Sequence, residues 1–305
     1  MLAYAIRRII LMVPLLFAIA TITFFLMHTV QGGPFDSDKP LSEATKINLD
    51  KRYGLDKSLP EQYISYIGNL LKADLGISFS NDRPVRDIIG DRFPISLQLG
   101  IFTFLFAIIF GLILGIFSSL NQNGLGDYVG VFVATSGAAL PSFVLAPILA
   151  IIFAVRLHWF NVIGWELWDY KTMVLPVVSF GFLNMAFVAR ISRASMLDVL
   201  RQDYIRTARA KGVKEFTVIM RHAVKNAIIP VLTISGPIFA NLVVGSFIIE
   251  RAFSIPGLGR TFVESVLNRD YGVIMGVTIF YGTIIVGMNL IVDLLYGIAD
   301  PRIRY

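Results

Sequence analysis

The chain has 305 residues, of which 55% are hydrophobic and only 16% are charged. A soluble globular domain carries roughly 25% charged residues, so this composition excludes an ordinary soluble domain and indicates a protein of the bilayer. The chain has no cysteine, which excludes disulfides and thiolate metal sites. The net charge of +6 is concentrated in particular loops. We therefore attribute it to membrane orientation, and expect the lipid bilayer and no nucleic acid as a partner.

Six apolar stretches are long enough to cross a hydrocarbon core about 30 Å thick. They lie at about residues 9–30, 95–120, 128–155, 172–189, 229–249 and 273–299. The first is longer than the apolar core of a signal peptide, and no A-x-A cleavage pattern follows it, so we expect a retained anchor. The sequence therefore predicts an all-α polytopic membrane protein with six transmembrane helices.

Basic residues are concentrated between the fourth and fifth apolar stretches. Residues 190–228 hold nine Lys or Arg and three acids. The positive-inside rule then predicts that this segment is cytoplasmic, together with both termini, and that residues 31–94 are extracytoplasmic. The expected organisation is a transmembrane helix at 1–30, a structured extracytoplasmic segment at 31–94, and a transmembrane domain at 95–305 with a cytoplasmic loop at about 190–228.

The segment 31–94 contains signals for two helices. Ser42 can cap a helix that ends before Gly54, and Ser58 with Glu61 has the spacing of a capping box. One face of the second helix is apolar, formed by Leu59, Tyr63, Tyr66, Ile67, Leu70 and Leu71. This helix either packs on the outer mouth or lies in the lipid headgroups, or it is a docking surface for a delivery protein.

The sequence contains no motif for catalysis or nucleotide binding. H-E-x-x-H, G-x-S-x-G, G-x-G-x-x-G and G-x-x-x-x-G-K-[ST] are all missing. We therefore expect no enzymatic activity, metal or cofactor in this chain. Glu250 and Asp293 are the only acids in the apolar stretches, and both lie near an edge. An ion-coupled secondary carrier is therefore a minor alternative, and a membrane-embedded enzyme a remote one.

The basic segment itself predicts two short helices. Asp203 can cap the first, Gly212 can end it in a left-handed conformation, and a second follows from about 214 to 227. Thr207, Ala208 and Ala210 are small enough to let a partner's backbone approach, while the arginines attract an acidic surface. The alternative is a basic re-entry loop with no partner, and periodicity does not decide between the two.

The run from Asp203 to Gly212, with Arg221-His222-Ala223 after it, resembles the EAA loop of ABC importer membrane subunits. Arg206-Thr207-Ala208 stands where the generic motif has Glu-Ala-Ala, as in peptide permeases. The resemblance extends to Gly32-Gly33-Pro34-Phe35, Pro141-Ser142-Phe143, Pro256-Gly257-Leu258-Gly259, Asn268-Arg269-Asp270-Tyr271 and the terminal residues 300–305. Taken together, these segments are similar to the B-type subunit of oligopeptide permeases.

The resemblance implies import of oligopeptides through the bacterial inner membrane. The implied partners are a second homologous permease subunit, two ABC ATPase subunits that bind ATP and Mg, and an extracytoplasmic binding protein that delivers the peptide. The residues expected to couple to the ATPase are Asp203, Tyr204, Arg206, Thr207, Ala208, Ala210, Lys211 and Gly212. The same machinery serving dipeptides, nickel chelates or glutathione is the alternative.

Two further sets of residues are candidates for functional sites. Pro141, Ser142 and Asn241 are candidates for the translocation pathway, although an interhelical hydrogen bond explains Asn241 equally well. Pro256, Gly257 and Gly259 are candidates for an external docking or gating loop. Two glycine pairs with small-xxx-small spacing, 111/115 and 272/276, are expected to serve packing within the chain.

Overall fold

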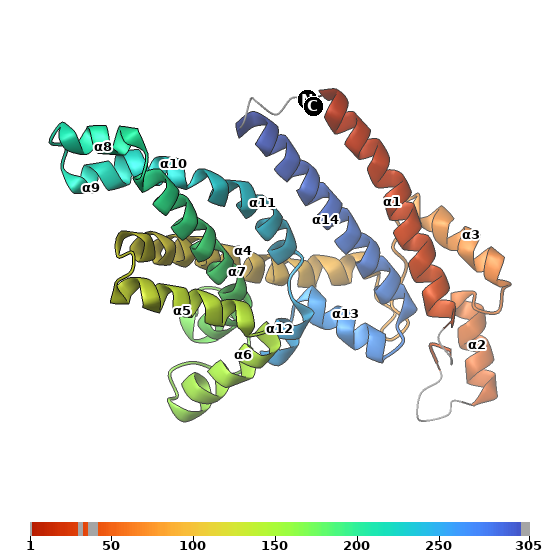
Figure 1. The fold of residues 1–305 in the computed structure, drawn as a ribbon. Helices are drawn as coiled ribbons and strands as arrows, with labels where there is room; N and C mark the ends of the chain where they lie inside the picture. The colour runs from red at the N-terminus through yellow and green to blue at the C-terminus, as the bar shows by residue number, and fades with distance from the viewer. Residues whose placement is uncertain (1, 30–32, 36–41, 300–305) are drawn as a thin grey trace. The chain divides into compact units, whose positions relative to one another are not determined.

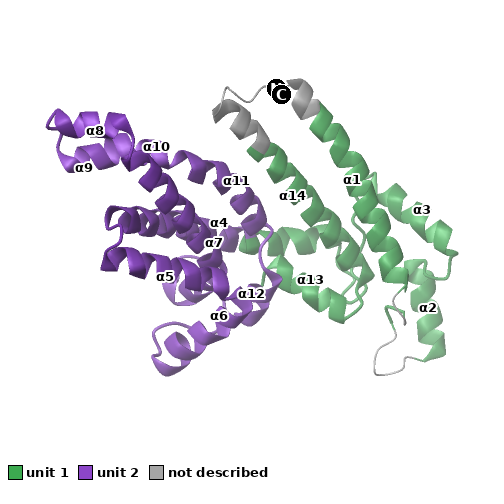
Figure 2. Cartoon of the chain, viewed as in Figure 1, with its two compact units in different colours: residues 1–96, 256–305 green, residues 97–255 purple. Residues whose placement is uncertain are grey.

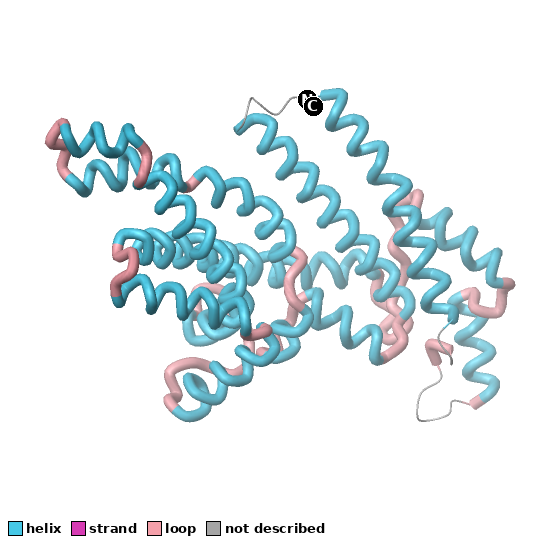
Figure 3. Tube along the Cα trace, viewed as in Figure 1, coloured by secondary structure: helices cyan, strands magenta, loops and turns pink. Residues whose placement is uncertain are grey.

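The computed structural model describes residues 2–29, 33–35 and 42–299, with side chains at 7–29, 33–35 and 42–292. Within these residues the named elements are helices and no strand forms (Figure 3). The chain divides into two compact units, residues 1–96 with 256–305 and residues 97–255 (Figure 2). Gly32, the Asp293 side chain and the terminal segment 300–305 lie outside the described residues.

Two long apolar helices, α1 (Leu2–Thr29) and α14 (Tyr271–Ala299), pack along each other in the first unit (Figure 1). This unit also contains α2 (Glu43–Tyr53), α3 (Leu59–Leu70), the first turns of α4 (Val85–Leu120) and α13 (Leu258–Leu267). Its core is a cluster of aliphatic side chains, formed by Val85, Ile88, Ile89, Leu258, Val273 and Val277. Burial of these groups joins α4, α13 and α14.

The helix ends predicted for α2 and α3 are confirmed. Ser42 Oγ accepts a hydrogen bond from the Thr45 amide at 3.3 Å. Gly54 ends α2 with φ +70°, and its N–H donates to the carbonyls of the last turn. At the start of α3, the Ser58 amide donates to Glu61 at 3.1 Å, as expected for a capping box.

A buried carboxylate holds a loop against the start of α14. Asp270 accepts hydrogen bonds from the Ser78 hydroxyl at 2.5 Å and from the Phe79 amide at 2.9 Å. A Cβ at Gly272 would lie only 1.9 Å from the Ile77 carbonyl oxygen, so a larger residue does not fit there. We call residues 77–80 with 270–273 the Asp270 joint. The close approach at Gly272 confirms that this glycine serves packing within the chain.

The second unit is arranged around α7 (Tyr170–Leu200). It contains the remainder of α4, α5 (Leu125–Ala139), α6 (Ser142–Leu149), η1 (Ala150–Arg156), α11 (Ile229–Val243) and α12 (Phe247–Ala252). Helices α5, α6, α11 and α12 all pack against α7. A Cβ at Gly115 of α4 would lie 2.5 Å from the Ala189 carbonyl of α7. This close contact again confirms packing within the chain.

Four helical segments among the described residues are long and apolar enough to cross a membrane. They are Arg7–Thr29, Val85–Leu120, Tyr170–Leu200 and Tyr271–Val292. The number reaches six when two bent helix pairs are each counted as one span. One pair is Leu125–Ala139 with Ser142–Arg156, bent by 111°, and the other is Glu215–Ala227 with Ile229–Val243, bent by 49°.

The predicted spans differ from the helices of the structure in several places, and 95–120 is part of a helix that already begins at Val85. The expected span 128–155 is broken into two helices, because Leu140 is extended (φ −96°, ψ 110°) before Pro141. Proline disfavours the helical conformation in the residue before it, which explains the break. The expected span 229–249 ends at Val243, because Gly245 has φ +83° and a separate helix follows. The expected span 172–189 is part of a helix that continues to Leu200. The prediction ended it early because it followed the run of apolar residues, and the last turns of this helix carry charged side chains.

Candidate functional site

Two antiparallel helical segments follow α7 and form what we call the basic hairpin, residues 203–227 (Figure 1). The first is α8 (Asp203–Ala210). The second consists of α9 (Glu215–Thr217), the π-helical turn η2 (Val218–Val224) and α10 (Lys225–Ala227). The predicted pair of helices is therefore present.

Small and aliphatic side chains form a core inside the basic hairpin. Ile205 is fully buried and Ala208 is 8% exposed. They pack with buried residues of the second segment and of α7, namely Met196, Val218, Ala223 and Ala227. Ala208 therefore belongs to the inner face of α8, which corrects the expectation that a partner's backbone approaches it. The three-residue spacing of Ile205 and Ala208 is the sequence signal for this shared face.

The C-terminal end of α8 agrees with the prediction, and the N-terminal end does not. Gly212 has φ +75°, which confirms the left-handed conformation expected of it. Asp203 is not the N-cap, because Gln202 occupies that position and makes no side-chain capping bond. Asp203 is instead the first helical residue, where its carboxylate lies 3.6 Å from Arg206. A carboxylate in the first turn still interacts favourably with the helix dipole.

Two polar contacts connect the segments of the hairpin across its turn. Arg209 forms a bidentate ion pair with Glu215, with a closest distance of 2.6 Å. The hydrogen bonds from Arg209 lower the pKa of the Glu215 carboxyl below its usual value. At the other end, the Asn226 amide donates to the Tyr204 hydroxyl at 3.0 Å. Because the ion pair is largely exposed, we assign it a small share of the stability.

The outward face of the hairpin carries most of the predicted coupling residues. The exposed ones are Asp203, Tyr204, Arg206, Thr207, Ala210, Lys211 and Gly212. The second segment adds two apolar side chains that the sequence analysis missed. Phe216 is 76% exposed and Met220 is half exposed. A phenylalanine among basic residues is the signal that could have identified this surface, because exposed aromatic groups are typical of protein contacts.

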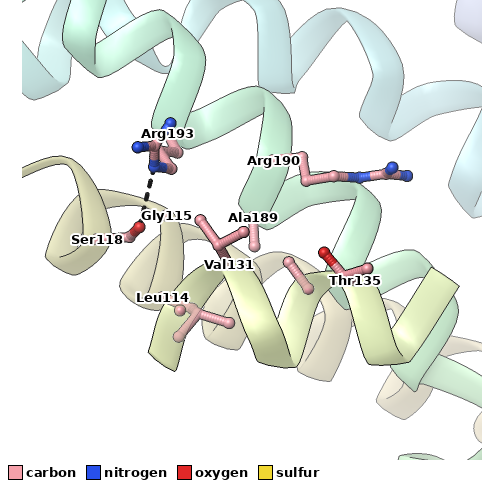
Figure 4. Close-up of a pocket in the computed structure, with 10 residues that line it drawn as sticks. Leu114, Gly115, Ser118, Val131, Thr135, Ala189, Arg190 and Arg193 are labelled. Carbon is pink, nitrogen blue, oxygen red and sulfur yellow. Dashed lines mark hydrogen bonds between the residues drawn. The ribbon is translucent and has the colours of Figure 1, made fainter. Parts of the chain in front are cut away.

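A buried ion pair connects α7 to α4 and α5 a few turns before the hairpin. Arg193 makes two hydrogen bonds of 2.7 Å to the buried Asp127. Its Nε also donates to Ser118, as Figure 4 shows. The Ser118 hydroxyl donates to Asp127 at 2.5 Å. A cavity of about 260 Å³ lies beside this cluster, between α4, α5 and α7. Planar bidentate pairs of this kind fix geometry, so α7 is tied to its neighbours where it leads into the hairpin.

The remaining predicted residues lie elsewhere and do not join this surface. Pro141 and Ser142 are at the break between α5 and α6. Asn241 is an exposed residue of α11. Gly257 and Gly259 are buried in the first unit, and the Leu258 amide between them donates to Ser96 Oγ at 2.8 Å. The Pro256 carbonyl accepts from Arg92 at 3.3 Å.

The fold is that of a known transporter chain. A crystal structure of an amino acid ABC transporter with histidines matches with a TM-score of 0.53, at 16% sequence identity. The match covers 69% of this chain and 93% of that chain. Together with the long apolar helices, it defines a helical membrane protein with several spans.

Residues 107–305 match the family described as binding-protein-dependent transport system inner membrane component. Residues 1–100 match the family described as the N-terminal part of such a membrane component. The chain therefore belongs to the binding-protein-dependent transport family, as a permease subunit of the bacterial inner membrane.

Full-length relatives are transport permeases. The oligopeptide transport system permease protein OppB of Haemophilus influenzae is 41% identical over 306 residues, covering both chains completely. OppB of Escherichia coli K12 has the same identity and coverage. The dipeptide transport system permease protein DppB of Bacillus subtilis is 42% identical, over 99% of this chain and 97% of that protein.

Proposed function

We propose that this subunit forms half of the pathway of an ABC importer for oligopeptides. The observation that carries the proposal is the 41% identity to OppB over the full length of both chains. A second homologous permease subunit completes the pathway, and an extracytoplasmic peptide-binding protein delivers the peptide. Two separate ATPase subunits bind ATP and Mg, because the sequence has no phosphate-binding loop.

The proposed topology has six spans: the four long helices, the bent pair Leu125–Ala139 with Ser142–Arg156 counted as one span, and Ile229–Val243 without the segment 215–227. Both termini and residues 190–228 are cytoplasmic, and residues 31–94 are extracytoplasmic. The excess of nine basic over three acidic residues in 190–228 supports this orientation. The basic hairpin then lies on the side where ATP is available.

Coupling to the ATPase is assigned to the exposed face of the basic hairpin. Tyr204, Thr207 and Ala210 of α8 lie outward, and Phe216 adds an apolar contact from the second segment. The hairpin has its own packed core, so it can move as a rigid body when a bound ATPase changes shape. The bidentate contact of Arg193 with Asp127 supports transmission of that motion to α5 through α7.

We assign the translocation pathway to Pro141, Ser142 and Asn241, and the external gate to Pro256, Gly257 and Gly259. Pro141 and Ser142 lie at a break where backbone groups are freed from helical bonding, which is tolerated where a span lines a cavity. Asn241 is placed in the same pathway, because its side chain is exposed on α11. For Pro256, Gly257 and Gly259, the burial of the two glycines supports a gating role over direct docking.

Dipeptides are the second candidate cargo, because DppB of Bacillus subtilis is as similar to this chain as OppB is. The experiment is uptake of a labelled hexapeptide and a labelled dipeptide by proteoliposomes containing the complete transporter. We expect ATP-dependent uptake with a preference for the hexapeptide. Preference for the dipeptide would show that dipeptides, and not oligopeptides, are the cargo. Uptake driven by an ion gradient without the ATPases would contradict the importer class.

A further inference from the structure

Helix α3 lies against the end of α1, within the stretch of α1 that is apolar enough to span. The Tyr63 hydroxyl of α3 lies 2.8 Å from the Thr21 hydroxyl of α1, and Gln62 Oε1 lies 3.1 Å from His28 Nε2. Thr21 is two turns inside the end of α1 at Thr29. Near this contact, the apolar side chains of Ile22 and Leu26 on α1 are exposed. If the apolar stretch of α1 spans the bilayer as proposed above, a helix held at this level of α1 lies at the boundary between headgroups and acyl chains.

The two faces of α3 fit that position. Ile64 is 70% exposed on one side, and Leu71, directly after the helix, is 85% exposed. Gln62, Ser65 and Asn69 lie on another side and line a cavity of about 320 Å³ within the first unit. An apolar face beside a polar one is the pattern of a helix that lies in the membrane interface.

The cavity is basic. Its lining includes four basic residues, Lys51, Arg52, Lys57 and His28. None of the residues that line it is Asp or Glu. Arg52 is paired with Asp82 at 3.0 Å. Lys51 and Lys57 form no ion pair with any residue that the structure describes. The cavity therefore has positive charge in excess and suits an anion.

A buried hydroxyl also lacks a partner in this cavity. Tyr66 Oη is buried and makes no hydrogen bond with the part of the chain that the structure describes. Burial, with a smaller effect of Tyr63, raises the pKa of Tyr66 to about 12, so the hydroxyl stays protonated. A buried donor without an acceptor is costly. An anionic oxygen in the cavity would accept from it.

We propose that this cavity binds the phosphate headgroup of an anionic phospholipid from the leaflet that borders α3. The lysines supply charge, the Tyr66 hydroxyl supplies a hydrogen bond, and the exposed apolar side chains of α1 and α3 lie along the acyl chains. A carboxylate of a protein partner would also suit the charge. The apolar surroundings favour the lipid, because that partner would approach through water rather than along the lipid-facing side of α1.

The experiment uses the full-length chain in phosphatidylcholine nanodiscs with and without phosphatidylglycerol. Retained lipid is measured by native mass spectrometry for the wild type, for Lys51→Gln with Lys57→Gln, and for Lys72→Gln. Lys72 is the matched control, because it is exposed in the same segment but does not line the cavity. We expect the double variant to bind phosphatidylglycerol about thirtyfold more weakly, since each basic residue near a membrane surface contributes roughly a factor of five.

The variant Tyr66→Phe tests whether the Tyr66 hydroxyl binds an anion or serves only the stability of the fold. We expect it to reduce retention of phosphatidylglycerol while its unfolding temperature in pure phosphatidylcholine is unchanged or higher. Equal retention by the wild type, the double lysine variant and Tyr66→Phe would overturn the proposal. So would full displacement of the lipid by millimolar inorganic phosphate, or occupation of the cavity only when an acidic protein partner is added.

Discussion

Aliphatic side chains hold the two segments of the basic hairpin together, whereas hydrogen bonds to one carboxylate hold the Asp270 joint. In the hairpin, Ile205 and Ala208 are buried and the polar side chains of α8 face outward. In the joint, Asp270 is buried and its oxygens are occupied by donors from residues 78–80. The hairpin therefore keeps a free polar and aromatic surface for a partner, while the joint uses its polar groups internally.

The difference predicts opposite responses to substitution. On the hairpin, the effect of a change should depend on which face of α8 it alters. At the joint, any loss of the carboxylate should reduce stability, because the buried Ser78 hydroxyl and the Phe79 amide lose a charged acceptor.

We expect the largest effect from Ala208→Glu. A charge without a partner in the hairpin core costs about 3–5 kcal/mol. Residues 203–227 should therefore lose protection in hydrogen–deuterium exchange. Ala210→Glu, on the exposed face, is the control and should keep wild-type protection. Equal protection in the two variants would contradict the assigned core.

Asp270→Ala should lower the free energy of unfolding by about 3 kcal/mol, because several amide and hydroxyl donors lose a charged acceptor. Thermal unfolding of the detergent-purified chain, followed by far-ultraviolet circular dichroism, measures this change, because all three tryptophans lie in the other unit. Asp56→Ala is the matched control, since Asp56 is exposed in the same unit. If both variants unfold at the same temperature, Asp270 does not hold the joint.

Gly212→Val should destabilise the hairpin by about 1–2 kcal/mol, the cost of a left-handed conformation for a residue with a side chain. Apart from the adjacent residues, no described part of the chain has an atom within 4 Å of a Cβ at this position, so the cost comes from the backbone and not from a clash. Gly212→Asn should cost less, because asparagine tolerates this region. Hydrogen exchange of α8 compares the two, and equal protection would show that the turn carries no strain.

Glu215→Gln should change stability by less than about 1 kcal/mol, because its pair with Arg209 is largely exposed. The folded-state pKa of Glu215 lies below the ordinary value of 4.5. The contribution of the pair is therefore full above pH 4.5 and is lost as the pH falls through the folded-state pKa. Hydrogen-exchange rates of the α8 amides at pH 7 and at acidic pH measure the contribution of this pair. A difference between wild type and variant that grows with acidity would contradict this sign.

The sequence predicted local structure better than contacts between distant residues. Ser42, Gly54 and Gly212 act within one helical turn, and each was placed correctly. Ala208 was misplaced, although its spacing from Ile205 carried the information.

No sequence pattern of this kind indicated the contacts between residues that are distant in the chain. Asp127 and Arg193 are 66 residues apart, so nothing in the sequence indicated their bidentate contact. The same applies to Asp270 and Ser78, which are 192 residues apart. Apolar windows located the spans, but they did not show that Leu140 and Pro141 bend one of them or that α7 continues to Leu200.

The central claim is that the exposed face of the basic hairpin couples this permease to its ATPase. The most direct measurement is peptide uptake and ATPase co-purification for Ala210→Glu and Lys214→Glu in the complete transporter. Ala210→Glu places bulk and charge where a partner approaches, and docking should weaken about a hundredfold or more. Lys214→Glu alters the net charge more but lies beyond Gly212, so its effect should be mild. Wild-type uptake by Ala210→Glu, with normal membrane insertion and bound ATPase, would contradict the claim.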